Sequence, residues 1–450
     1  MEDNKKQKTE EVTNDNVGVF SARLEALISA ALQDGVLTDK EREIIKIIQE
    51  AIDKNNKGNA SSNEISNSNR EGYYIKNGKK IILPTSTEVI KEREFAVIEN
   101  LEKVVFPSSL VKIESSAFSG CTNLVELDFS QCLKLKEIGE SVFLNCGLKS
   151  IDLSRCTSLE TIGESAFRGC KRLTNIVFPN PASIQEIPEK MCYGLKALES
   201  VDLSKCTQLK RICECAFACT PNLKEVLLPD SIEVMEKWAM AESGNIKHIN
   251  MPPLLKEMGY GVFAGSKIEA IDFSRVNLLK SIPEATFGQC GKLKSIILPS
   301  SLEEVGEYFF EGINTVLKNI DFSKVSSLEV IPSQFLMCDS IKTITIPMGV
   351  KTIEDYAFRN MSKLEKMFLP PTLEHFGSFG YYDIDLYCFA PQLDELEPLV
   401  DGLEPGDSLR LYVLPQYLRT YIEQRDAEGV SDKILSLQAM PDEYLYYSDN

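Results

Sequence analysis

The chain has 450 residues, 43% of them hydrophobic, and a formal net charge of −18. This length suits two or three ordinary domains or one long repeat array, and the hydrophobic share suits a sizeable folded core. Because such an acidic chain repels phosphate backbones, nucleic acid is not an expected partner, and no apolar run reaches the length of a membrane span.

The first 70 residues are expected to form a helical hairpin between two flexible segments. Residues 1–20 are charged and lack the apolar stretch of a secretory signal, so we expect disorder there and a cytoplasmic protein. Residues 21–53 place apolar residues at helical spacing, and Thr38 with Glu41 forms a capping box for the second helix. The stretch "QDGVLTDKE" resembles the TerB-like helical family. Residues 54–70 are polar and of low complexity, which predicts a tether.

Residues 71–376 repeat one short motif every 22–26 residues. Three of its copies read "SSAFSGC" (115–121), "ESAFRGC" (164–170) and "EATFGQC" (284–290). The aromatic position of the motif recurs at Phe95, Phe118, Phe143, Phe167, Phe217, Phe263, Phe287, Phe310 and Phe358, with Cys192, Met240 and Leu336 in degenerate copies. A fixed period of this size is typical of a solenoid, in which each repeat stacks on its neighbours.

Each copy also carries a pair of apolar residues separated by one residue, as in Val104/Phe106, and thirteen such pairs occur. Alternation with period two places both side chains of a pair on one face of a strand. One strand per turn therefore predicts a parallel sheet along one side of a solenoid of about 13 turns. Leu110, Ile113 and Phe118 are expected to point inward, and the "ESAF" segment is expected to form a short helical or tight turn.

Stretches such as "LVKIESSAFSGCTNL" (110–124) and "ILPSSLEEVGEYFFEG" (297–312) resemble the leucine-rich repeats of the BspA-like (Treponema pallidum-type) family. The predicted fold class is an α/β repeat: a leucine-rich-repeat solenoid with one parallel strand per 22–26-residue turn, a small N-terminal helical hairpin and a C-terminal α/β cap. The resemblance implies a curved solenoid that binds proteins. Because several relatives are secreted or surface-attached adhesins, it also implies an alternative, a surface or exported adhesin.

Five strands carry an aspartate at the outward place between the two inward residues, namely Asp128, Asp152, Asp202, Asp272 and Asp321. A serine follows each aspartate by two residues, whereas the other eight strands have proline there and no aspartate. Proline removes a backbone N–H that has lost its sheet partner, and an aspartate can instead accept that N–H in an Asx-turn. We interpret the five aspartates as structural turn caps, with an ion site or a catalytic site as the alternative.

The remaining candidates for chemistry point away from an enzyme. Most of the thirteen cysteines recur in fixed slots of the repeat, which predicts free thiols that pack in the core. The cluster "CECAFAC" (213–219) lacks the paired spacing of a zinc site, and the only two histidines, His248 and His375, lie about five turns apart. The single tryptophan, Trp238, is interpreted as a local packing residue. We expect no catalytic residues, cofactor, metal or small-molecule substrate.

Residues 377–450 leave the repeat and hold nine of the fifteen tyrosines. The stretch "LRLYVLPQYLRTYIEQ" (409–424) predicts a strand followed by a helix, and "DKILSLQAM" (432–440) predicts a further strand. An acidic, tyrosine-rich C-terminal cap is the expected role, because the last turn of an array would otherwise expose its core. An aromatic binding pocket between the cap and the array is the alternative.

The outward residues of the proline-type turns suggest where a partner binds. Five of them form an apolar row: Val105, Val177, Leu227, Ile297 and Phe368. An exposed apolar row lowers solubility unless another surface covers it. The sequence therefore predicts a non-enzymatic protein–protein interaction scaffold that binds an unidentified protein along its strand face. Sugar binding is disfavoured, because sugar sites favour exposed Trp or Tyr and the only aromatic in this row is Phe368.

Overall fold

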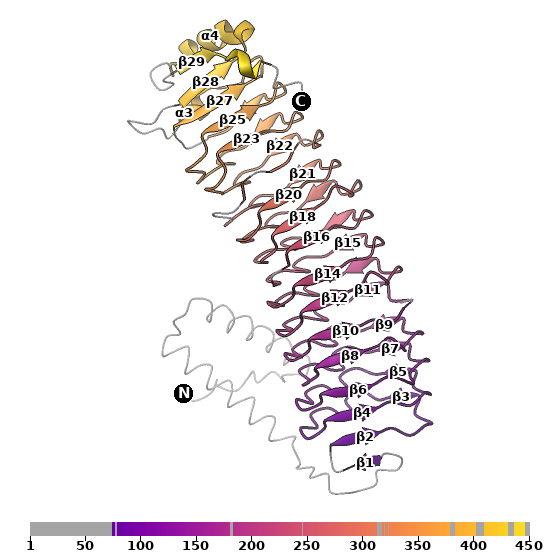
Figure 1. Cartoon of the computed structure of the whole chain (residues 1–450). Helices are drawn as coiled ribbons and strands as arrows, with labels where there is room; N and C mark the ends of the chain where they lie inside the picture. The colour runs from indigo at the N-terminus through magenta and orange to yellow at the C-terminus, as the bar shows by residue number, and fades with distance from the viewer. Residues whose placement is uncertain are drawn as a thin grey trace, which may run out of the picture. The chain divides into compact units, whose positions relative to one another are not determined.

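The structure, a computed structural model, describes residues 74–76 and 79–445 except 181–182, 245, 313–316, 319, 323, 379–382, 402–408 and 431–435. The chain separates into two compact units, Met1–Ser68 and Asn69–Asn450. The segment 1–20, the predicted helical hairpin 21–53 and the tether 54–70 lie outside the described residues. The described residues belong to the second unit, coloured in Figure 1.

One series of short strands contains the predicted apolar pairs and runs along one side of the second unit (Figure 1). Its members are β2 (Lys80–Ile82), β4 (Lys103–Val105), β6 (Glu126–Asp128), β8 (Ser150–Asp152), β10 (Asn175–Val177), β12 (Ser200–Asp202), β14 (Glu225–Leu227), β16 (His248–Asn250), β18 (Ala270–Asp272), β20 (Ser295–Ile297), β23 (Thr343–Thr345) and β25 (Lys366–Leu369). Where these strands pair, they pair in parallel with equivalent residues opposite each other, as in Val104 opposite Leu127. At its start, β1 (Tyr74–Lys76) pairs antiparallel with β2.

Each turn contains a second strand, which the sequence analysis did not predict. These two-residue strands are β3 (Val89–Ile90), β5 (Lys112–Ile113), β7 (Glu137–Ile138), β9 (Thr161–Ile162), β11 (Glu186–Ile187), β13 (Arg211–Ile212), β15 (Val234–Met235), β17 (Glu257–Met258), β19 (Ser281–Ile282), β21 (Glu304–Val305), β22 (Val330–Ile331), β24 (Thr352–Ile353) and β26 (His375–Phe376). The second residue of each strand is buried, so the inward position predicted at Ile113 is confirmed. Each turn therefore contributes to two parallel ladders.

The "ESAF" segments close each turn without forming a helix, so the tight-turn alternative holds for the described residues. Two residues adopt left-handed backbone geometry in each segment except that of Gln334, which has one, and Ser116 (φ 56°) and Gly120 (φ 77°) are an example of the pair. This geometry turns backbone N–H groups toward the next repeat: Ser116 donates to the carbonyl of Glu140 at 2.8 Å and Phe118 to that of Val142 at 3.0 Å. Each turn is therefore hydrogen-bonded to the next on three sides: through the two series of strands and through these left-handed segments.

The aromatic residues of the motif stack along the core. One run joins Phe95, Phe118, Phe143 and Phe167 with ring centroids 5.3, 5.7 and 5.9 Å apart, and a second joins Phe263, Phe287 and Phe310 at 5.9 and 5.7 Å. These separations lie in the range at which aromatic pairs attract each other. The degenerate copies at Cys192 and Met240, which are also fully buried, lie between the two runs.

The repeated cysteines link successive turns through their thiols. The Sγ of Cys121 donates to the backbone carbonyl of Phe95 at 3.1 Å, and the Sγ of Cys170 donates to that of Phe143 at 3.0 Å. All thirteen cysteines are free, and all are buried except Cys219, which is partly exposed. The thiols therefore fill small spaces in the core and donate to backbone carbonyls of the preceding turn.

The predicted strand, helix and further strand of the C-terminal segment are confirmed as β28 (Leu409–Val413), α4 (Leu418–Glu428) and β29 (Ser436–Ala439). The segment also contains β27 (Ile384–Cys388), α3 (Glu397–Val400), η1 (Pro415–Tyr417) and η2 (Asp442–Tyr444). β27, β28 and β29 extend the β23–β25 sheet in parallel, so the segment continues the array as it closes it. α4 lies over the last strands (Figure 1) and fully buries Tyr421, whose hydroxyl donates to the carbonyl of Ala390 at 3.2 Å. Among the described residues, no helix has the length and apolar character of a membrane span.

The left-handed slot that closes the motif predicts one stabilising substitution. Gly120, Asn145 and Gly169 occupy this slot in successive turns, but the first turn places the β-branched Val97 there, at φ 58°. Val97 is 68% exposed, so its side chain contributes little packing. Because asparagine tolerates left-handed geometry far better than valine, Val97→Asn should raise the free energy of unfolding by about 1 kcal/mol.

Urea unfolding of the purified protein would measure this change. Val177→Asn is the matched control, because Val177 is also exposed but lies in an extended strand, where asparagine is disfavoured. An equal or lower midpoint for Val97→Asn than for the unsubstituted chain would show that the left-handed valine carries no strain.

Candidate functional site

The outward residues of the first strand series form a row, but the exposed apolar residues predicted on it are not neighbours of one another. Asp152 lies opposite Val177, Asp202 opposite Leu227, and Asp272 opposite Ile297. Val177, Leu227 and Ile297 are 38%, 42% and 36% exposed, and Val105 is half-buried. Val177, Leu227 and Ile297 therefore reach the surface as separate apolar points, each beside an aspartate, while Val105 lies between Asp128 and the exposed Ile82.

Phe368 holds its place in the outward row, but it is covered, so the exposure predicted for it was wrong. Its side chain is only 3% exposed. Its ring stacks on Tyr387 at 4.8 Å, and the ring of Tyr444 lies 5.5 Å away. The physical reason is that the sheet continues past β25 into the C-terminal segment, which then crosses the outer face of these strands.

The aspartates lie where the sequence analysis expected turn caps. Their Oδ1 atoms accept the backbone N–H of the serine two residues later at 3.1 Å for Asp128, 2.9 Å for Asp152, 2.9 Å for Asp202 and 2.7 Å for Asp272. The hydroxyl and the backbone N–H of Ser130 both hold the pKa of Asp128 below its usual range. Asp321 forms an isolated parallel β-bridge with Ile297 through the backbone. The serine that follows it, residue 323, lies outside the described residues. How much these bonds stabilise each turn stays a prediction.

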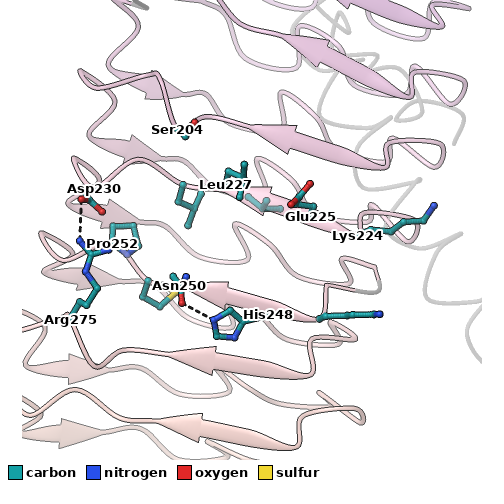
Figure 2. A pocket seen from close by; sticks show the side chains of 13 residues that line it. Ser204, Lys224, Glu225, Leu227, Asp230, His248, Asn250, Pro252 and Arg275 are labelled. Carbon is teal, nitrogen blue, oxygen red and sulfur yellow. Dashed lines mark hydrogen bonds and ion pairs between the residues drawn. The ribbon is translucent and has the colours of Figure 1, made fainter.

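An open groove of about 860 Å³ lies on the outward row between β14 and β16 (Figure 2). β14 pairs with β12 and β16 with β18, and no ladder joins β14 to β16 among the described residues. Apolar atoms line the groove at Leu227, Leu228, Met251 and Pro252. The strand series is interrupted in the same way between β6 and β8 and between β10 and β12. Leu227 is the predicted partner-binding residue that lines the groove.

Charged and polar groups surround this apolar centre. Lys224 lies at one end of the groove and forms an ion pair with Glu199 at 3.0 Å. At the other end Arg275 pairs with Asp230 at 3.1 Å, as Figure 2 shows. The Nε2 of His248 lies 2.6 Å from the Oδ1 of Asn250. The groove can thus bury an apolar side chain and offer hydrogen bonds and ion pairs at its rim.

A second open groove, of about 1020 Å³, lies further along the same row. It is lined by Ile320 and Phe322 on one turn and by Thr343, Thr345 and Met348 on the next. The 44% exposed Met348 is its most accessible large apolar side chain among those that the structure describes. None of the predicted partner-binding residues lines this groove.

The two histidines lie far apart, and the clustered thiols have raised pKa values. His248 lies on β16 and His375 on β26, in different strand series. No group of three or more His, Cys, Asp or Glu among the described residues could hold a metal ion. Burial raises the pKa of the thiols in the "CECAFAC" cluster to about 12 for Cys213 and about 11 for Cys215 and Cys219. A nucleophilic cysteine requires the opposite shift.

Trp238 is both packed and exposed. Its indole lies so close to Gly261 that a Cβ at that glycine would come within 2.8 Å of it, and its ring meets that of Tyr260 edge-on at 5.6 Å. Trp238 nevertheless keeps 38% of its surface exposed. The indole therefore packs against the next turn, as predicted, but part of the ring also reaches the surface.

The sequence matches one family model, described as the BspA type leucine rich repeat region, in six copies over residues 67–154, 136–269 and 256–387. A leucine-rich repeat protein from Bacteroides ovatus is 21% identical, with a TM-score of 0.51 over 82% of this chain and 94% of that one. A leucine rich cell surface protein from Faecalibacterium prausnitzii is 20% identical, with a TM-score of 0.36 over 67% and 87%. A leucine rich repeat protein of T. pallidum is 18% identical, with a TM-score of 0.24 over 53% and 85%. Comparison with the curated proteins finds no match.

The capping interpretation predicts a modest and calcium-independent effect. Asp202→Ala should lower the free energy of unfolding by about 1 kcal/mol, the usual net contribution of one hydrogen bond. Asp202→Asn keeps an oxygen that can accept the N–H of Ser204 and should retain most of that stability. Thermal unfolding with and without calcium would measure both variants. A melting temperature that calcium raises in the original chain but not in Asp202→Ala would favour an ion site instead.

The burial of the thiols, which raises the pKa of groups such as Cys121 and Cys213, predicts slow chemical labelling. At about pH 8 a thiol with a raised pKa is almost wholly protonated, and the thiolate is the reactive form. Native protein should therefore react with iodoacetamide at less than one site, with the partly exposed Cys219 reacting first. After denaturation without reductant all thirteen cysteines should react. Mass spectrometry would count the labels, and stable disulfides between cysteines would contradict the expectation.

Proposed function

This chain belongs to the BspA-type leucine-rich-repeat family, and from that premise we propose that it is a non-enzymatic scaffold that binds another protein along its strand face. The groove between β14 and β16 is the centre of the proposed interface. The observation that carries the proposal is Leu227, an apolar side chain 42% exposed in a groove with an apolar lining and a charged rim.

The composition of the groove matches that of protein interfaces. Such interfaces combine an apolar centre with a polar and charged rim, and a few residues contribute most of the binding energy. Here Leu227 and Leu228 supply the centre, while Lys224 and the Asp230–Arg275 pair supply the rim. Ile297 adds a further apolar point on β20.

The proposed location is the cytoplasm, and the cysteines support it. Thirteen free thiols in a chain of this length suit a reducing compartment, where disulfides rarely form. The family resemblance also supports the alternative of a surface or exported adhesin that binds host or neighbouring-cell proteins. Fractionation of the native cells, with the protein detected by antibody, distinguishes the two locations.

Two substitutions on the strand face test the proposed interface. Leu227→Lys combined with Ile297→Lys places a charge at each apolar point, so the double variant should capture its main protein partner from native cells at least about tenfold less well. Its melting temperature should stay close to that of the original chain, because both side chains point away from the core. Removal of residues 1–70 should leave capture unchanged or strengthen it.

A matched control is Leu133→Lys combined with Leu278→Lys, because these leucines are 48% and 51% exposed but lie outside the outward row. The control should capture the partner normally. If the Leu227/Ile297 variant captures it equally well while loss of residues 377–450 abolishes capture, then the partner binds the C-terminal segment and the proposed interface is wrong.

A further inference from the structure

The last strands of the array carry a stack of aromatic rings on their outer face. Phe368 on β25, Tyr387 on β27 and Tyr412 on β28 are opposite one another in the sheet. Their ring centroids lie 4.8 and 4.9 Å apart, with planes tilted by only 16° and 10°. These three rings, the aromatic platform, occupy the same outward row that earlier holds the exposed Leu227 and Ile297.

A short segment from the end of the chain covers this platform. Residues 440–445, the C-terminal strap, follow β29 and include η2. The ring of Tyr444 lies 4.6 Å from that of Tyr387 and 5.5 Å from that of Phe368. The Nζ of Lys366 donates to the hydroxyl of Tyr444 at 3.1 Å and lies 5.5 Å from the centre of its ring. One tyrosine of the strap therefore meets both an aromatic surface and a cation.

The strap and the platform form a hydrophobic cluster separate from the main core. Phe368, Tyr387, Phe389 and Met440 make up its buried part, and Leu445 packs against it. The main core is closed at this end by α4, which buries Tyr421 on the opposite side of the sheet. Because α4 already covers the end of the main core, the strap is not needed for that purpose. It covers instead the outer face of the sheet, which earlier in the array is exposed.

The strap also has the properties of a small docked ligand. It folds as a tight turn through its own hydrogen bonds, Tyr444 N–H to the carbonyl of Pro441 at 3.0 Å and Leu445 N–H to that of Asp442 at 3.3 Å. Asp442 and Glu443 stay exposed, while Tyr444 and Leu445 are half-buried. Its recognition thus depends on a tyrosine and a leucine carried by an acidic turn.

We propose that the aromatic platform is a second protein-binding site, that the strap is its resident occupant, and that its partner presents a tyrosine and a following leucine on an acidic turn. The incoming tyrosine takes the place of Tyr444 on Phe368 and Tyr387 and receives the hydrogen bond from Lys366. Because the strap is part of the same chain, its effective concentration at the platform is high, and a partner binds weakly until the strap leaves. The site is independent of the Leu227 groove, so either proposal can fail alone.

The probe is a fluorescent synthetic peptide with the sequence of residues 441–450, "PDEYLYYSDN". A chain that ends at Pro441 keeps β29 and Met440 and should bind the peptide at least about tenfold more tightly than the full chain, because the competing occupant is gone. Tyr444→Ser in the full chain should also bind the peptide more tightly than the original chain does. Fluorescence anisotropy measures both affinities.

Three controls locate the bound peptide. Lys366→Met in the shortened chain should weaken binding, as should replacement of the first tyrosine of the peptide by serine. Leu227→Lys should have no effect. If neither the shortened chain nor Tyr444→Ser binds the peptide more tightly than the full chain does, the strap is a structural element only. Binding that Lys366→Met leaves unchanged places the peptide elsewhere and also overturns the proposal.

The same experiment addresses a second copy of the chain as the occupant. Sedimentation of the full chain should show a monomer under the conditions of the peptide titration. A dimer that Tyr444→Ser dissociates would mean that straps are exchanged between copies, and this would overturn the role of the strap as a resident occupant of its own platform.

Discussion

The contact between one turn and the next is the interaction on which the rest of this structure depends. No turn can bury its own inward side chains, so Phe118 is covered by Phe95 on one side and Phe143 on the other. The same contact satisfies backbone groups on all three sides of the turn, through two parallel ladders and the left-handed segments between them. Stability in such an array is close to a sum over neighbouring pairs of turns. A turn can therefore vary at its surface as long as these contacts persist.

This constraint explains which parts of the fold could be predicted from sequence. The inward residues recur because every turn needs them, so the first strand series, the burial of Ile113 and the aromatic stack were all predictable. The second strand series has only two residues per turn, too few to show a period. The left-handed positions carry side chains as different as Ser116, Cys215 and Trp238, because hydrogen bonds to the next turn fix their geometry without selecting one residue type.

The candidate site was predicted less completely, and the reason is physical. Outward residues make no contact that the repeat requires, so local pattern indicates only which way they point. Phe368 occupies the same position of the repeat as Leu227, but the ring of Tyr444 covers it. Tyr444 also accepts a hydrogen bond from Lys366, which lies 78 residues earlier in the chain, so no local pattern could indicate this contact. The groove likewise depends on how side chains of two successive turns, such as Leu228 and Met251, lie against each other, which no local sequence pattern marks. Turn chemistry gives one useful signal: Pro229 and Pro252 follow these two strands, so neither outward residue is used as a cap.

The interruption of the aromatic stack has a consequence for how the chain folds and opens. Repeat arrays can nucleate at any sufficiently stable group of turns and then grow outward. The two stacked runs, ending at Phe167 and beginning again at Phe263, are the places where such nuclei would form. The turn that carries Leu227 lies between them, where Met240 replaces an aromatic ring, and the turn that carries Asn250 begins the second run with Phe263. The turn of Leu227 would therefore join the array later than the two stacked runs and exchange its amide hydrogens sooner than they do, so the groove adjoins a turn that opens more easily than its stacked neighbours.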